Sequence, residues 1–202
     1  MHKLLFASLF LLLAACGTDN AATATAEPSP AETATAPNVF AAADAALAEG
    51  APVAEVRQLL LADFPKVSDA QTGLPHPKNS KDFVKAAVAL SDRNPADTLA
   101  ADPLYKAAEV ARGLNDSRQA ADIYRKLYDR YPNYSKAPEA LFMLAFTYDE
   151  NLKDYDRARA TYEEFLAKHP DHFFAKDAPL MIKNLGKTSE ELLKELESQQ
   201  EQ

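Results

Sequence analysis

The sequence predicts an all-α domain in which helix–turn–helix repeats stack into a solenoid that capping helices close at its ends. One observation is an amphipathic segment at 119–132 that recurs at 155–170, each copy ending in proline. A second is a constant offset of 38 residues, which pairs Ala120 with Ala158, Tyr124 with Tyr162, and Pro132 with Pro170. Similarity at a fixed offset indicates a repeat architecture. The composition agrees, because five glycines and abundant alanine favour helices.

The first 15 residues have the pattern of a signal peptide. A basic start is followed by an apolar run at 4–13, which is too short to remain as a membrane-spanning helix. Ala14, Ala15 and the sole cysteine, Cys16, come next. This pattern resembles a bacterial lipobox and implies a lipoprotein signal peptide at 1–15. Cys16 would then carry the acyl chains and anchor the protein to a membrane without spanning it.

Residues 16–38 are expected to form a disordered tether after the lipidated cysteine. The segment from Gly17 onward consists mainly of Ala, Thr, Pro and Glu and contains no large apolar side chain. Such a segment cannot bury enough surface to offset the entropy lost on ordering. Gly17 also stands where enteric lipoproteins of the inner membrane have aspartate, so the resemblance implies the periplasmic face of the outer membrane.

The remaining residues, 39–202, suit one α-helical domain. The formal net charge is −8, and basic residues are interspersed with acidic ones instead of forming a cluster. Nucleic acid is therefore excluded as a partner, because no basic face is available to replace the counterions of phosphates.

At the N-terminal end of this domain, 39–50 and 53–64 predict a pair of capping helices separated by Gly50 and Pro52. Residues 81–95 predict the second helix of an incomplete repeat. The segment between them contains three prolines and a glycine, so no regular helix is expected there.

The clearest repeats span 101–134 and 138–172. In each, a first helix rich in alanine or large apolar residues (102–114, 139–149) precedes an amphipathic second helix. The second copy has one extra residue in the turn between its helices. At the C-terminal end, 177–186 begins a third copy, and Thr188 and Glu191 form a capping box that starts a polar terminal helix.

These two segments resemble the tetratricopeptide repeat (TPR) family. The first copy supplies the pattern with Leu104, Ala107, Ala108, Ala111, Ala120, Tyr124, Leu127 and Pro132. The second supplies it with Leu141, Leu144, Ala145, Tyr148, Ala158, Tyr162, Phe165 and Pro170. The run at 132–145 is also similar to the repeats of the outer-membrane β-barrel assembly lipoproteins and of the Tol-Pal-associated periplasmic coordinators.

In this family the first helices line an inner groove that binds a partner. The resemblance therefore implies a groove formed by Asp102, Tyr105, Glu109, Arg112, Glu139, Phe142, Phe146 and Asp149. An acidic rim around aromatic rings suits an apolar or basic peptide. Because 139–149 is apolar nearly all round, Phe142 and Phe146 could instead be core residues, and both alternatives stay open at this point.

We expect no catalytic site, metal or cofactor. No phosphate-binding glycine loop or nucleophile motif is present, and the carboxylates lie on solvated helix faces. His169 and His172, in the turn after the second repeat, are the one pair with the chemistry of metal ligands. The sequence thus predicts a lipid-anchored adaptor that binds an envelope protein or peptide. The alternatives are a metal-dependent envelope enzyme that uses this turn and a passive structural spacer.

Overall fold

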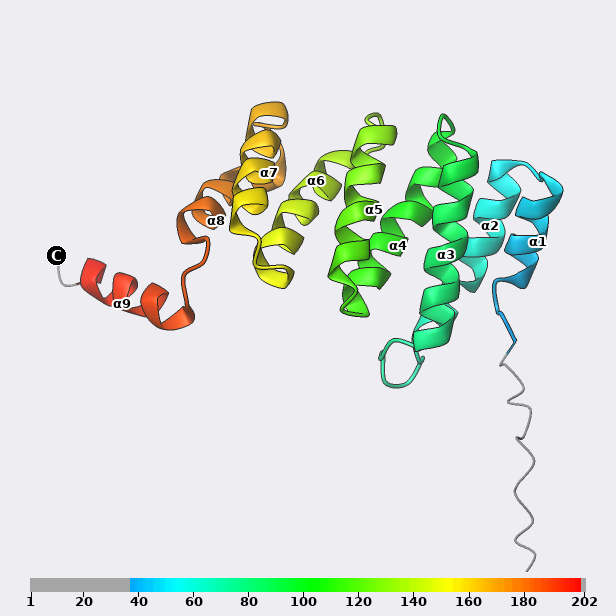
Figure 1. Ribbon diagram of the computed structural model, residues 1–202, viewed down its shortest axis with the longest axis horizontal. Helices are drawn as coiled ribbons and strands as arrows, with labels where there is room; N and C mark the ends of the chain where they lie inside the picture. Colours follow the sequence, from blue (N-terminus) through cyan, green and yellow to red (C-terminus); the bar gives the residue numbers. More distant parts are fainter. Residues whose placement is uncertain (1–36, 201–202) are drawn as a thin grey trace, which may run out of the picture. The chain divides into compact units, whose positions relative to one another are not determined.

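The structure is a computed structural model that describes residues 37–200 (Figure 1). The predicted signal peptide, Cys16 and the tether up to residue 36 lie outside the described residues. The described part is helical, with one isolated β-bridge between Ser68 and Pro75. This confirms the predicted all-α, TPR-like solenoid. Its α-helices are α1 Ala41–Glu49, α2 Val53–Asp63, α3 Pro77–Arg93, α4 Ala101–Gly113, α5 Ser117–Arg130, α6 Ala137–Phe146, α7 Tyr155–Lys168, α8 Ala178–Asn184 and α9 Ser189–Gln200.

The predicted capping pair at the N-terminal end is present as α1 and α2. Gly50 ends α1 with a left-handed φ of 76°, a conformation that glycine adopts without the steric cost of a Cβ atom. Aromatic rings next to these two helices pack on α3. The ring centres of Phe40 and Phe64 lie 5.4 and 4.9 Å from that of Phe83.

Between α2 and α3 the chain forms a short 3-10 turn, η1 (Phe64–Val67), and a loop without an α-helix, as the prolines predict. The helix that follows is longer than predicted, because it starts at Pro77 instead of residue 81. Proline is tolerated in a first turn, where its missing N–H would have no helical partner. The Nδ1 atom of His76 accepts a hydrogen bond from the backbone N–H of Asn79, 3.4 Å away, and caps this start.

The two clearest repeats are the helix pairs α4–α5 and α6–α7. Each helix from α3 to α7 packs against the next one along the chain, so that α7 packs against α8 (Figure 1). Ala108 and Ala120 in the first repeat, and Ala145 and Ala158 in the second, are fully buried. These small residues allow the paired helices to approach closely. Their burial explains why alanine recurs at the same offset.

The second repeat differs from the first at the end of its first helix. The sequence predicts one helix over 139–149, but α6 ends at Phe146 and continues as a π-helical turn, η3 (Thr147–Asn151). The backbone N–H of Leu152 donates to the carbonyl oxygen of Thr147, five residues earlier, at 3.0 Å. A π-turn holds one residue more than an α-turn. The extra residue of the second copy is therefore taken up here.

The second helices are connected by contacts that recur from one repeat to the next. The Tyr131 hydroxyl lies 2.9 Å from Ser91 Oγ and donates to the carbonyl oxygen of Asn94 at 3.1 Å, tying the end of α5 to α3. His169, at the equivalent position of the next copy, places Nε2 3.0 Å from the Tyr128 hydroxyl of α5.

The charged face of α7 also takes part in packing. The predicted pair within α7, between Glu164 and Lys168, is present at 2.8 Å. Glu164 in addition accepts from Arg125 of α5 at 2.9 Å. This second pair was not predicted, because it depends on how α5 and α7 are placed next to each other.

The C-terminal part consists of a 3-10 turn, η4 (Phe173–Lys176), followed by α8 and α9. The predicted capping box is confirmed. The Thr188 backbone N–H donates to the Glu191 carboxylate at 2.7 Å, and the Glu191 N–H donates to the Thr188 hydroxyl at 3.2 Å. On α9, Leu193 is 57% exposed. Among residues 37–200, no helix has both the length and the apolar content that a membrane span requires.

Candidate functional site

The predicted groove residues lie on α4, on α6 and on the π-turn η3, which are the first-helix segments of the two repeats. The structure places them in different environments. Some of them join helices to each other and others are core residues. Three charged members, Glu109, Arg112 and Asp149, form no ion pair with a described residue.

The acidic residues at the start of the two first helices join neighbouring helices. Asp102 accepts from Arg57 of α2 at 3.4 Å and from the Tyr134 hydroxyl at 3.2 Å. Glu139 accepts from the Tyr105 hydroxyl at 2.8 Å. Burial, and then the hydrogen bond to Glu139, raise the pKa of Tyr105, so it stays a neutral donor. Both carboxylates therefore have protein partners before any ligand arrives.

Two aromatic members of the set are buried. Tyr105 is 2% exposed and Phe142 is 7% exposed. The Phe142 ring stacks on Phe174 of η4 with ring centres 4.6 Å apart and an angle of 18°. Phe142 is therefore a core residue in this structure, whereas Phe146 is half-buried and keeps accessible surface. The burial of Phe142 depends on η4, which lies beyond the second repeat, and the repeat pattern does not predict that contact.

The first repeat leaves polar atoms unpaired at the end of α4. Arg112 is half-buried, and its Nε atom has no hydrogen-bond partner among the described residues. The hydroxyl of Tyr124, from α5, is also buried without a partner. Burial raises the pKa of Tyr124 to about 12, and nearby Arg112 acts in the opposite direction. Glu109 is exposed on the same helix.

The second repeat has a carboxylate at the position equivalent to Arg112. Asp149 is only 6% exposed, yet no described residue donates a hydrogen bond or forms an ion pair to its side chain. Burial, and then the charge of Glu150, raise its pKa. Tyr162, which occupies the place of Tyr124, has a buried hydroxyl without a partner. Burial raises the pKa of Tyr162, and the carboxylates of Asp149 and Glu150 raise it further.

Asp149 lines a cavity of about 470 Å³ that the sequence did not predict. The walls come from η3, from the start of α7, and from the segment that joins α8 to α9; they include Tyr155, Gly186 and Leu192. No sequence pattern predicts that the α8–α9 segment approaches Asp149, since the two are far apart in the chain. The one signal that could have indicated this place is the extra residue between the helices of the second copy.

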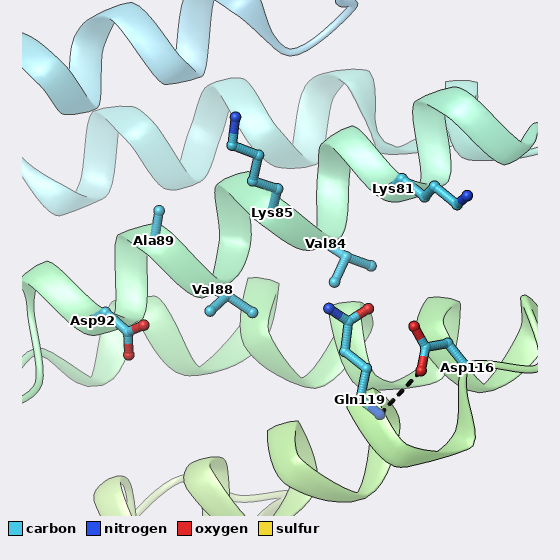
Figure 2. A pocket seen from close by; sticks show the side chains of 8 residues that line it. All are labelled: Lys81, Val84, Lys85, Val88, Ala89, Asp92, Asp116 and Gln119. Carbon is cyan, nitrogen blue, oxygen red and sulfur yellow. Dashed lines mark hydrogen bonds between the residues drawn. The ribbon is translucent and has the colours of Figure 1, made fainter.

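A second hollow, of about 460 Å³, lies between α3 and α5. Figure 2 shows Val84 of α3 pointing toward Gln119 of α5, whose backbone N–H donates to Asp116 at 3.2 Å. Lys85 points away from α5 in this view. This hollow is formed by second helices and contains none of the predicted groove residues.

The histidines considered as metal ligands have other contacts. His169 faces Tyr128, as described above, and desolvation lowers its pKa. His172 Nδ1 accepts from the backbone N–H of Phe174 at 3.3 Å and caps η4. Across residues 37–200, no three His, Cys, Asp or Glu side chains are grouped so as to hold a metal. Both histidines thus have structural roles in the turn between repeats.

Comparison with known proteins supports the repeat assignment. The tetratricopeptide repeat family matches residues 104–134 and 139–172, which correspond to α4–α5 and α6–α7. No curated protein and no solved structure matches the chain. The family match supports a TPR protein, and TPR domains are typically non-catalytic scaffolds that bind protein partners.

Proposed function

Because residues 104–134 and 139–172 are tetratricopeptide repeats, we propose that the protein is an adaptor that docks an envelope protein or peptide. In this proposal, lipid chains on Cys16 anchor it to the outer membrane, and its helical domain faces the periplasm. Its role would be in the assembly or maintenance of the envelope. The observation that carries the adaptor function is the pair of repeats.

The polar surface of the first helices supports a protein partner. Contacts of Asp102, Tyr105 and Glu139 hold α2, α4 and α6 together, and Phe142 packs α6 against η4. The order of the first helices therefore does not depend on a ligand. A preorganised surface loses less entropy on binding than a flexible one. Phe146, Arg112 and Asp149 remain for contact with a partner.

The proposed location rests on the N-terminal sequence. Ala14, Ala15 and Cys16 follow the apolar run directly, and Gly17 replaces the aspartate that favours the inner membrane in enteric lipoproteins. The composition of residues 17–38 suits a tether that keeps the domain away from the lipid surface, at up to about 3.1 Å per residue if extended. The TPR match supports the adaptor function but does not bear on this location.

The anchor is tested with the full chain in a Gram-negative host grown with an alkyne-labelled palmitate. We expect the label to travel with the protein into the outer-membrane fraction, and Cys16→Ser to abolish both the label and the membrane association. An unlabelled wild type, or a labelled Cys16→Ser variant, would overturn the anchor.

The adaptor function is tested separately, by affinity purification of the lipidated protein from native membranes with quantitative mass spectrometry. We expect one envelope protein to be enriched in stoichiometric amount. Recovery of the protein alone would favour the passive spacer.

A further inference from the structure

The cavity beside Asp149 contains a negative charge that the protein does not neutralise. Asp149 is more than nine-tenths buried and lines the cavity, and none of the described residues is paired with it. A buried carboxylate is ordinarily paired or hydrogen-bonded, because removing it from water without compensation is costly. A carboxylate in this state would gain from a ligand that supplies the missing charge.

The other charged groups of the cavity wall already have partners. Glu150 pairs with Lys153 at 3.3 Å, and both residues are exposed. Lys187 pairs with Glu195 of α9 at 2.5 Å. Lys153 also acts on Asp149 through its charge and offsets part of the rise in the pKa of Asp149 that burial and Glu150 cause, but no described residue forms a hydrogen bond or an ion pair with the Asp149 side chain.

The local backbone keeps Asp149 in this position. It belongs to the π-turn η3, which takes up the extra residue of the second repeat. Such turns are frequent at functional sites. The buried, unpaired hydroxyl of Tyr162 adds a second polar atom beside Asp149 that has no partner among the described residues.

An aromatic ring forms part of the cavity wall. The ring of Tyr155 is 38% exposed, lines the cavity and lies against Gly186 of the α8–α9 segment. Gly186 permits this arrangement, because a Cβ there would lie 3.3 Å from the Tyr155 ring and the residue has a φ of 76°. Aromatic rings attract organic cations. A metal would need several ligands, and no group of three metal-binding side chains occurs in the described part.

We propose that this cavity is a subsite for an organic cation, the ammonium or guanidinium group of a basic side chain on the partner protein, with Asp149 as the counter-charge. The identity of the partner rests on the proposed adaptor function, whereas the binding of the cation does not.

The test is an NMR titration of the ¹⁵N-labelled full chain with n-butylammonium chloride and with n-butylguanidinium chloride. The amide signals of Gly186 and Ser189 report on the cavity. Neutral n-butanol of the same length and sodium chloride at equal ionic strength are the control ligands. We expect saturable shifts with one or both organic cations and none with the controls. Which of the two cations binds more tightly distinguishes a lysine from an arginine partner residue.

Variants locate the binding. Asp149→Asn should weaken the affinity roughly tenfold or more, as expected for loss of a charged hydrogen bond. Asp122→Asn removes the same charge from an exposed aspartate of α5 and should leave the affinity unchanged. Tyr155→Leu should weaken binding roughly two- to fivefold, and it tests the site independently if Asp149→Asn perturbs the fold.

Equal shifts with n-butanol, no saturable shift with either cation, or undiminished binding by a folded Asp149→Asn would overturn the proposal. The titration needs neither lipid nor partner. If the cavity binds the organic cations but the affinity purification recovers no envelope protein, the adaptor function is refuted and the subsite stands. If an envelope protein is recovered but the cavity binds neither cation, only the subsite is refuted.

Discussion

Replacing Asp149 by asparagine should stabilise the free protein at neutral pH. The change removes the charge and keeps the size of a side chain that is 6% exposed and has no partner among the described residues. An unpaired buried polar group costs about 1–3 kcal/mol, and the amide of asparagine retains part of that cost. The Asp149 carboxylate lines a cavity and is not among the fully buried unpaired atoms, so contact with water reduces this cost. We therefore expect a gain of up to about 1 kcal/mol in the free energy of unfolding, which for a chain of this size corresponds to a rise of up to roughly 4 °C in Tm.

The sign of the pH dependence follows from the raised pKa of Asp149 in the folded protein. Below the pKa of the unfolded chain, the carboxyl is neutral in both states and adds no penalty. As the pH rises through the interval between the unfolded and the folded pKa, the folded state holds the proton longer, so stability is lost. The advantage of Asp149→Asn should thus be largest at pH 7 and shrink as the pH falls toward 4.

The assay is urea denaturation at pH 7, 6, 5 and 4, followed by circular dichroism, with Asp122→Asn as the matched control. The control should show no such trend, because its carboxylate is exposed to solvent. If Asp149→Asn lowered the stability at pH 7, Asp149 would have a stabilising partner; if the difference were as large at pH 4 as at pH 7, it would not arise from the charge of Asp149.

Three further predictions concern packing, each measured as a change in the denaturation midpoint. Tyr162→Phe should change the free energy of unfolding by less than about 0.5 kcal/mol, because the Tyr162 hydroxyl has no partner among the described residues. Tyr131→Phe should cost about 1–2 kcal/mol, because it removes the hydrogen bond to Ser91. Equal losses of stability in the two variants would contradict this difference. Ala158→Leu should cost roughly 1–3 kcal/mol or prevent folding, because the alanine is fully buried where α6 and α7 meet, and a neutral result would refute that close packing. Gly186→Ala should cost about 1 kcal/mol from its left-handed φ, and should shift the Tyr155 signals in NMR spectra; unchanged Tyr155 signals would show that this ring does not rest on the glycine.

The second helices could be predicted well from the sequence because their signal is local. Ala158, Tyr162 and Phe165 recur at helical spacing, and all three are fully buried in α7. Pro170 marks where the helix stops, because it disfavours the helical conformation of the residue before it. These features depend on neighbours in the chain and on the offset between copies, both of which are visible in the sequence.

The first helix of the second repeat could not be predicted as well. An extra residue in a copy can lengthen a loop or be taken into a helix as a π-turn, and the pattern of apolar residues does not distinguish the two. Likewise, 139–149 is apolar on all sides, so the burial of Phe142 depended on whether another element would cover it. That element, η4, follows the repeat, and Phe174 within it stacks on the Phe142 ring.

The predicted groove was a set of positions carried over from a family pattern, and the structure separates these positions by environment. Asp102 and Glu139 are paired to neighbouring helices, which no spacing rule predicts because their partners come from other helices or loops. Arg112 and Asp149 share one place in consecutive repeats and have opposite charge. We therefore expect a partner to bind near the ends of α4 and α6 and not along the whole length of the first helices.

The most direct measurement of the central claim, that the first-helix ridge docks an envelope protein, is site-specific photocrosslinking in cells. A benzophenone amino acid at Phe146, which is half-buried on α6, is compared with the same group at Asp122 on the exposed face of α5. We expect one discrete adduct with an envelope protein from position 146 and none from position 122. No adduct from position 146, or the same adducts from both positions, would contradict it.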